Sequence, residues 1–477
     1  MKNIVALFVL TSTALLCRPT LAQDQKPATQ PEAAKAPEAK KDATLDLYVT
    51  LMPFIEYART SGPTRAGFAE GPALAPVPGV ALPATGHIGT AVAQYDAVNG
   101  PPRMRMTSGT SHVGIRGSLR LAEQLRLLGQ FETAMPIDGD PNPWEAFVPN
   151  RNSYLGFTGD WGTLAFGLLD TPYRWITMTT INPIKGGYVA DYTPIIGTPG
   201  FLATAVNPAQ RWGGSGESNV AFDRREANSI QYWSPTLFGL YLRGSYTINE
   251  LRASDSAASV RSNPFIVSIG GGFDGDEVGL AGLRLRYAWE HHHDYYGLAY
   301  IYTVLAGAPD ENTRTGNDYG NKAVAQYTLT VNPDIKTRVA GIGEYLKYTL
   351  HASLPGDVNR YERPAFYALA EQTVFKHHLW GAYGRAYSGK CGRVPLPDGT
   401  PVPCTTSHVG AQLIMGGYMF AFSEKAQAYL AAYRLINERS ALYVTTPKLS
   451  REGLSPGLDT TGVGVGFYYT FGADLLQ

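Results

Sequence analysis

Residues 150–169, NRNSYLGFTGDWGTLAFGLL, alternate in character with a period of two on both sides of a Gly-Asp-Trp-Gly turn. Leu155 and Phe157 belong to an apolar row, whereas Gly156 and Thr158 lie on the opposite face. A period of two predicts β-strands, and the turn between them predicts an antiparallel hairpin. The second face is small and polar, as expected of a surface that meets water. Repeated along the chain, the pattern predicts a closed sheet that is apolar outside and polar inside, which is a transmembrane barrel.

The first 22 residues have the composition of a secretory signal peptide. Lys2 supplies the positive start, an apolar stretch follows, and Thr-Leu-Ala precedes Gln23 as a cleavage site. Cys17 raises the alternative of a lipoprotein signal, but the large Leu16 before it is a poor match to the small residue that such processing needs. We therefore expect an exported chain that starts near Gln23.

The rest of the chain divides into three predicted segments. Residues 23–43 are rich in Ala, Pro, Lys and Glu without an aromatic residue, which predicts a solvated periplasmic linker. No apolar run of about 18 residues follows, so no membrane helix is predicted. Because lipid requires every backbone polar group to be paired internally, a membrane protein without such helices must be a closed barrel. We expect this barrel over residues 44–471 and a C-terminal extension over 472–477.

The charge balance and the cysteines limit the ligands and cross-links that the chain is expected to have. Lys plus Arg and Asp plus Glu both number 40, a balance that does not favour nucleic acid as a partner. Cys391 and Cys404 flank a segment rich in Pro and Gly. In an oxidising compartment they predict a disulfide across one surface loop, and no close ligands support a metal pair.

Strand signals recur along the whole chain and alternate between short turns and long connections, as in outer-membrane barrels. The segment PFIVSIGGG at 264–272 is compatible with either a strand or a loop. Our count is sixteen strands. They are expected near 44–58, 111–117, 124–132, 152–158, 163–169, 228–234, 236–247, 279–290, 295–305, 320–331, 335–348, 364–374, 377–387, 409–422, 426–437 and 462–471.

The faces opposite the apolar rows carry charge, including Arg116, Arg126 and Glu132. A charged inner wall that faces itself across a closed sheet needs water between, which predicts a channel. In a narrow barrel the arginines would instead pair with Glu132 or Glu56 and fill the lumen. About sixteen strands leave room for water, which favours ion steering.

The chain resembles the general trimeric porins of Gram-negative outer membranes, in the branch known from β-proteobacteria. The resemblance is carried, in order, by LDLYVTLMPFIEY, SHVGIRGSLRLAEQLRLLGQFE, NRNSYLGFTGDWGTLAFGLLDTPY, RREANSIQYWSP and GYMFAFSEKAQAYLAAY. It implies an all-β, 16-stranded antiparallel transmembrane β-barrel with a long third loop, here about 171–227, folded into the lumen. It also implies a homotrimer in lipid and lipopolysaccharide that passes small hydrophilic solutes and ions passively, without a cofactor.

The resemblance also implies a constriction between a basic wall and the third loop. Leu168 stands where family members often have an arginine, so the sign of selectivity is not predicted. The family usually ends on Phe, whereas this chain continues beyond Phe471. The candidates for the wall are His112, Arg116, Arg126 and Arg174, and those for the loop are Lys185, Asp191, Arg211, Glu217 and Asp223.

Three other clusters have alternative interpretations. His291–His293 would bind a metal only in a turn, because adjacent strand residues face opposite sides, and a polar turn or strand end is favoured. FDGDE at 273–277 has oxygen ligands for calcium without a full calcium loop, so a solvated outer loop is favoured. No catalytic motif is present, and we expect no enzyme.

Two alternatives to a diffusion porin stay open. A substrate-selective channel would need an aromatic slide, for which the third loop offers Tyr188, Tyr192, Phe201 and Trp212. A surface adhesin would carry its function on the loops and conduct no current.

Overall fold

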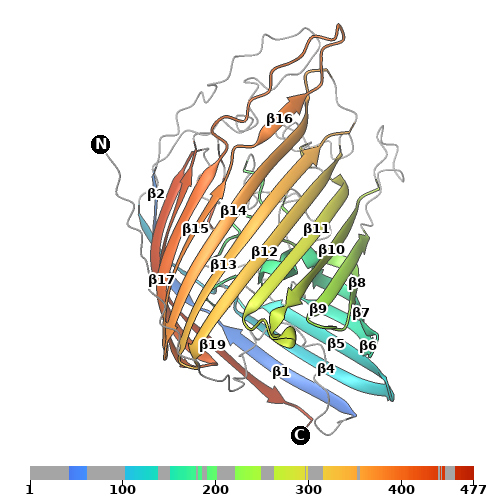
Figure 1. The fold of residues 1–477 in the computed structure, drawn as a ribbon, viewed down its shortest axis with the longest axis vertical. Coiled ribbons are helices and arrows are strands. Elements are labelled where there is room, and N and C mark those ends of the chain that lie inside the picture. Colours follow the sequence, from blue (N-terminus) through green and yellow to red (C-terminus); the bar gives the residue numbers. More distant parts are fainter. Residues whose placement is uncertain are drawn as a thin grey trace.

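In a computed structural model, the chain forms one closed antiparallel β-sheet (Figure 1). All the strand pairs are antiparallel, and the first pass closes the ring, because β1 pairs with both β4 and β19. The structure describes residues 42–61, 102–137, 151–178, 181–184, 191–200, 221–248, 263–295, 297–298, 315–351, 355–438, 441, 443–445 and 457–476.

The described elements are nineteen strands, one short α-helix and a 3₁₀ turn. They are β1 (Ala43–Leu51), β2 (Phe54–Ser61), β3 (Arg103–Thr107), β4 (His112–Ala122), β5 (Leu125–Ala134), β6 (Ser153–Gly159), β7 (Gly162–Asp170), α1 (Pro172–Met178), β8 (Arg225–Trp233), β9 (Leu240–Ile248), β10 (Phe265–Asp274), η3 (Gly275–Val278), β11 (Leu283–Tyr295), β12 (Gly316–Asn332), β13 (Ile335–Thr349), β14 (Val358–Val374), β15 (His377–Ala386), β16 (Lys390–Arg393), β17 (Ala411–Ser423), β18 (Ala426–Asn437) and β19 (Asp459–Asp474).

The nineteen strands make sixteen passes, because three passes are each broken into two pieces. Both β1 and β2 pair with β19, and the break between them falls at Met52–Pro53. Proline has no backbone N–H for the ladder, which explains the interruption. In the same way, β3 and β4 form one pass, in which β3 pairs with β2 and β4 pairs with β1. The strands β15 and β16 form another, because both pair with β14. The predicted sixteen-stranded barrel is confirmed.

The two faces of the wall differ as the alternation predicted. Along β19, Val463, Val465 and Phe467 are exposed on the outside, while Gly464 and Tyr468 are buried on the inner face. In the 152–169 hairpin, Leu155 and Phe157 are likewise exposed. An outer apolar surface suits lipid, and the inner face is left to polar groups and to the chain segments packed against it.

The two rims of the barrel also differ. Short turns join β4 to β5, β6 to β7, β12 to β13, β14 to β15 and β17 to β18, whereas the connections at the opposite rim are longer. The last strand continues beyond Phe471 to Asp474, so part of the predicted extension belongs to the wall. Among the described helices none has the length and apolarity to cross a membrane.

One stretch of the strand prediction was wrong. PFIVSIGGG contributes to β10, and the next strand is β11, so the strand expected at 279–290 extends to Tyr295. The strand expected at 295–305 is absent from its described part: residues 297–298 form a turn, and the remainder lies outside the described residues. Three consecutive glycines hid the alternation of β10. On its inner face, a side chain at Gly270 would contact Pro172 of α1.

Candidate functional site

After β7 the chain turns onto the inner face of the wall, and its described residues 171–178, 181–184, 191–200 and 221–224 are called the internal segment, or the segment. It begins with α1, whose first residue is Pro172, a favoured start because proline lacks the N–H that the first turn leaves unpaired. Trp175 N donates to Thr171 O at 2.9 Å, and the backbone N–H of Tyr173 donates to Ser268 Oγ of β10 at 3.1 Å. The helix packs against β10 and β11, so it lies against strands several passes away from β7.

A buried carboxylate on β13 binds two parts of this segment at once. Glu344 accepts a hydrogen bond from Tyr173 Oη at 2.7 Å and from the backbone N–H of Gly197 at 2.8 and 2.9 Å. Arg363 of β14 lies 3.3 Å from Glu344 and donates to the carbonyl oxygens of Ile195 and Thr198. Hydrogen bonds to charged groups are the strong ones, so this network ties the segment to the far wall.

A second buried ion pair holds the end of the segment. Lys322 Nζ of β12 lies 2.8 Å from Asp223 Oδ1 and 3.1 Å from Thr177 Oγ1. Tyr192 Oη donates to Thr177 Oγ1 at 2.7 Å. Burial raises the pKa of Asp223 to about 7, although the Lys322 ammonium opposes that shift. The pair links residues 99 positions apart in the chain.

Two glycines of the inner wall leave room for apolar residues of the segment. A Cβ on Gly320 of β12 would lie 2.6 Å from the Phe222 ring, and one on Gly384 of β15 would lie 2.2 Å from Ile195. Both distances are too short for carbon atoms in contact. A larger residue at Gly320 would therefore displace the Phe222 ring, and one at Gly384 would displace the end of the Ile195 side chain.

Apolar side chains complete the contact. Tyr173, Ile176, Tyr192 and Phe222 of the segment belong to one buried cluster with inner-face residues of β13 and β14. The Phe222 ring stacks on His292 with centroids 4.3 Å apart, and Tyr192 meets Tyr367 edge-on at 6.3 Å. Such burial stabilises the attachment through the hydrophobic effect, beyond the polar anchors.

The predicted wall residues lie at different places. His112, Arg116 and Arg126 are on β4 and β5 on the inner face, but Arg174 is on α1 rather than on a strand. Arg174 is the first arginine after Leu168, and the chain passes from β7 into α1 between the two. Its Nε lies 3.0 Å from Asp170 Oδ1.

The remaining wall candidates have distinct partners. His112 is buried, with Nε2 3.9 Å from Glu132 Oε2. Arg116 Nε lies 3.3 Å from Asp46 Oδ2, and its side chain is 49% exposed. Arg126 donates to Ser118 Oγ at 2.8 Å. Arg116 is therefore more open to solvent than the buried residues of the wall that hold the segment.

Of the loop candidates, only Asp191 and Asp223 are described. Asp191 Oδ1 accepts a hydrogen bond from Thr193 N at 3.0 Å, and burial raises the pKa of Asp191 to about 6. The other candidates of the segment lie outside the described residues: Lys185, Arg211 and Glu217, and the aromatic residues Tyr188, Phe201 and Trp212.

Sequence reasoning missed the anchors on the far wall, Lys322, Glu344 and Arg363. Their signal was present, since each is a charged residue at an inner-face position of a late strand. The predicted wall candidates came from the family resemblance, which placed them only on strands before the third loop or close to its start.

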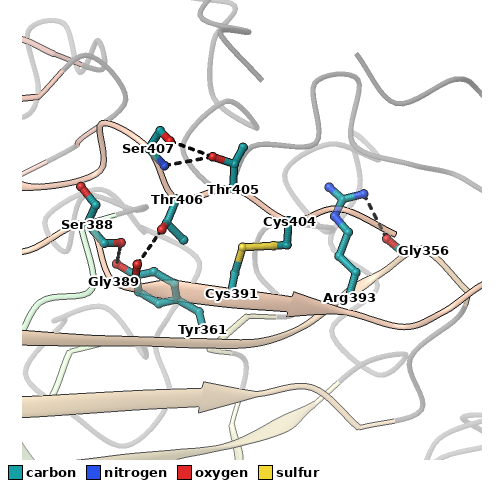
Figure 2. Close-up of a disulfide and its surroundings, with 10 residues drawn as sticks. All are labelled: Gly356, Tyr361, Ser388, Gly389, Cys391, Arg393, Cys404, Thr405, Thr406 and Ser407. Carbon is teal, nitrogen blue, oxygen red and sulfur yellow. Dashed lines mark hydrogen bonds between the residues drawn. A yellow bond between two sulfur atoms is a disulfide. The ribbon is translucent and has the colours of Figure 1, made fainter. Parts of the chain in front are cut away.

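The two late cysteines form a disulfide at the rim with long connections (Figure 2). Cys391 of β16 bonds to Cys404, with Cα atoms 5.7 Å apart. Close by, Thr406 Oγ1 donates to Gly389 O at 2.7 Å and Arg393 donates to Gly356 O at 3.2 Å. The bridge fixes the connection after β16 onto the barrel.

The histidine and acidic clusters have structural places. His291–His293 lie near the end of β11, with His292 buried on the inner face. Asp274 ends β10 and Asp276 lies in η3, and both pair with Arg284. The acidic cluster therefore belongs to a short connection that contains a 3₁₀ turn. Across the described ranges, no group of three or more His, Cys, Asp or Glu side chains could hold a metal ion.

Fold and inner face together define a transmembrane β-barrel whose charged interior carries a packed segment of its own chain. A family profile described as "Gram-negative porin" matches residues 66–441. The chain belongs to this family of outer-membrane channels.

A solved porin structure supports the fold, and two further structures show weaker similarity. An anion-selective porin from Comamonas acidovorans is 14% identical with a TM-score of 0.58, over 90% of this chain and 100% of that one. A loop L8 deletion mutant of OmpT from Vibrio cholerae is 13% identical with a TM-score of 0.49, over 90% and 100% of the chains. OmpF of Salmonella typhi, in complex with daunomycin, is 13% identical with a TM-score of 0.48, over 90% and 97%. Comparison with curated protein sequences finds no match.

Proposed function

We propose that this porin lets small hydrophilic solutes and ions diffuse passively through a lumen narrowed by residues 171–227. The supporting observation is the contrast in exposure around the inner face. Lys322, Glu344 and Arg363 are fully buried beneath the segment, whereas Arg116 on the opposite part of the wall is 49% exposed. Water and solute then pass between the segment and strands β4 and β5.

In this proposal the charged groups on the two sides of the path govern ion passage. Arg116 and Arg126 line one side, with His112 at the end of β4, while Asp191, Asp223 and Arg174 belong to the segment. Charges on low-dielectric walls change the local concentration of ions and thereby the selectivity. Lys185, Arg211 and Glu217 contribute further charge from the same segment.

Conductance of the purified protein in a planar lipid bilayer tests the proposal. Stepwise current increments that grow with salt concentration are expected. A correctly folded protein that inserts without current would refute the channel. Solute flux that rises linearly with concentration supports general diffusion, whereas saturating flux would replace it with a substrate-selective channel.

We further propose that the mature chain starts near Gln23 and assembles as a homotrimer in the outer membrane. Residues 1–22 then act as the signal peptide and 23–43 as the linker. N-terminal sequencing of the exported protein tests the cleavage site. Migration of unheated protein as a large detergent-resistant species that collapses on heating tests the trimer, and a monomer at both temperatures would refute it.

A further inference from the structure

Arg243 of β9 is held between two indole rings on the inner face of the wall. Its guanidinium carbon lies 3.7 Å from the centroid of the Trp175 ring on α1 and 4.7 Å from that of Trp233 on β8. Trp233 is the direct partner of Arg243 in the strand register, and on the other side its partner is Gly270. The indoles therefore cover the guanidinium from two neighbouring elements.

Arg243 forms no salt bridge and no hydrogen bond with the described residues. Its contacts there are the two rings, and none of its nitrogen atoms is a buried atom that lacks a hydrogen-bond partner. The Asp170 carboxylate attracts Arg243 less strongly than Arg286 repels it. Other inner-face arginines are paired: Arg284 lies 3.5 Å from Asp274, and Arg338 pairs with Glu371. Cation–π contact orients a guanidinium without neutralising it.

A second guanidinium adds to the positive charge. Arg286 of β11 lies 5.4 Å from the centroid of the same Trp175 ring and 6.0 Å from that of Tyr241. It also donates to the carbonyl oxygen of Ile176, at the end of α1, at 3.5 Å. Two positive groups thus share one indole, and Coulomb repulsion between them favours an anion nearby.

We propose that Arg243, clamped by Trp175 and Trp233, is a binding site for small oxyanions, meaning carboxylate or phosphate groups, on the lumenal wall beside α1. The proposal rests on the proposed channel function, because the anion reaches the site from the lumen. Both indole contacts are with the guanidinium carbon, and the N–H donors of Arg243 have no acceptor among the described residues. That fork matches two oxygens of a carboxylate or phosphate.

Current block in a planar bilayer tests the site. Potassium chloride current is measured at 0.1 M salt, where exposed charges are incompletely screened, while sodium phosphate or sodium acetate is added in separate series. We expect saturable block by one or both anions, and the stronger blocker identifies the preferred group. Arg243→Gln should raise the half-blocking concentration about tenfold, as expected from loss of a hydrogen bond to a charged group. The half-blocking concentration of Arg243→Lys should lie between those of the unmodified protein and Arg243→Gln, because lysine keeps the charge but lacks the paired N–H donors of the guanidinium.

Arg284→Gln is the matched control. It removes the same formal charge from the neighbouring inner face, but from an arginine that already has carboxylate partners. Its half-blocking concentration should stay near that of the unmodified protein. No block by either anion, no effect of Arg243→Gln, or an equal effect of Arg284→Gln would overturn the site.

Tryptophan fluorescence tests the site without conduction. Iodide, an anionic quencher, should quench the folded protein in detergent more than the neutral quencher acrylamide does, because iodide concentrates beside the clamped indoles. Arg243→Gln should reduce the iodide quenching and leave acrylamide quenching unchanged. Unchanged iodide quenching would refute the site. If Arg243→Gln lowers iodide quenching but the protein passes no current, the channel function is refuted and the anion site is retained.

Discussion

Glu344 offers the sharpest test of how the internal segment is attached. The substitution Glu344→Gln keeps the shape of the side chain but replaces one accepting oxygen with a donating NH₂ group. In the structure both oxygens accept: one from Tyr173 and Gly197, and the other from Gly197 and Arg363. Glutamine can therefore retain one set of contacts, while its amide nitrogen faces donors.

The expected magnitude follows from burial. Removing one partner of a buried charged pair costs about 3–5 kcal/mol, and the contacts that glutamine retains favour the lower end. At 1.4 kcal/mol per tenfold, a loss of about 3 kcal/mol raises the population of detached segment about a hundredfold. The barrel ladder does not involve this side chain, so the wall itself should stay intact.

Two measurements follow the segment and the wall separately. Hydrogen–deuterium exchange of the peptide covering 191–200 should accelerate in Glu344→Gln, and single-channel recordings should show added steps to higher conductance. Heat-dependent migration on gels should match the unmodified protein.

Glu371→Gln is the control, because Glu371 is also a buried inner-face carboxylate but pairs with Arg338 and His378 of the wall. If both variants behave alike, or if exchange over 191–200 does not change, the assignment of Glu344 as the anchor is wrong.

Three further predictions concern the same interior and the rim. Gly320→Ala should raise conductance, because overpacking against the segment costs about 1–3 kcal/mol and favours its detachment. Gly343→Ala, which has open space at its Cβ, should leave conductance unchanged. Equal conductances of the two variants would contradict the close contact at Gly320. Because burial raises the pKa of Asp191 to about 6 and that of Asp223 to about 7, attachment should weaken as pH rises from about 4 to 7. Asp191→Asn should make this trend smaller below pH 6 in pH-corrected exchange, and a trend of unchanged size would exclude Asp191 as a contributor. Replacing Cys391 and Cys404 by serine should cost the rim connection about 3 kcal/mol, seen as faster proteolysis there with an unchanged barrel; unchanged proteolysis would mean that other contacts fix it.

The strand alternation was predictable because it depends on neighbouring residues. The apolar rows of the 152–169 hairpin and of β19 repeat every second residue, and lipid on one side enforces that repeat. Where the alternation is missing, the strand was not predicted. The glycines at 270–272 have no side chains, so β10 could not be distinguished from a loop.

The anchors of the internal segment were beyond reach for a different reason. Periodicity assigns Lys322 and Glu344 to the inner face, but it does not say what they meet there. Their partners, Asp223 and Tyr173, are 99 and 171 positions away. Only the closed barrel and the path of the segment bring them together. Arg243 illustrates the same limit, since its clamp needs Trp175 from α1 and Trp233 from β8.

The pairing of β1 with β19 has a consequence for how the barrel folds. Thr50 and Thr470, whose hydroxyl oxygens lie 3.3 Å apart, are 420 positions apart in the chain. Contacts between distant positions form slowly, because the loop-closure entropy must be lost before the contact stabilises anything. Until the last strand meets the first, the sheet has two unpaired edges that can pair with other chains. The step that completes the barrel is thus also the step that removes its exposure to aggregation.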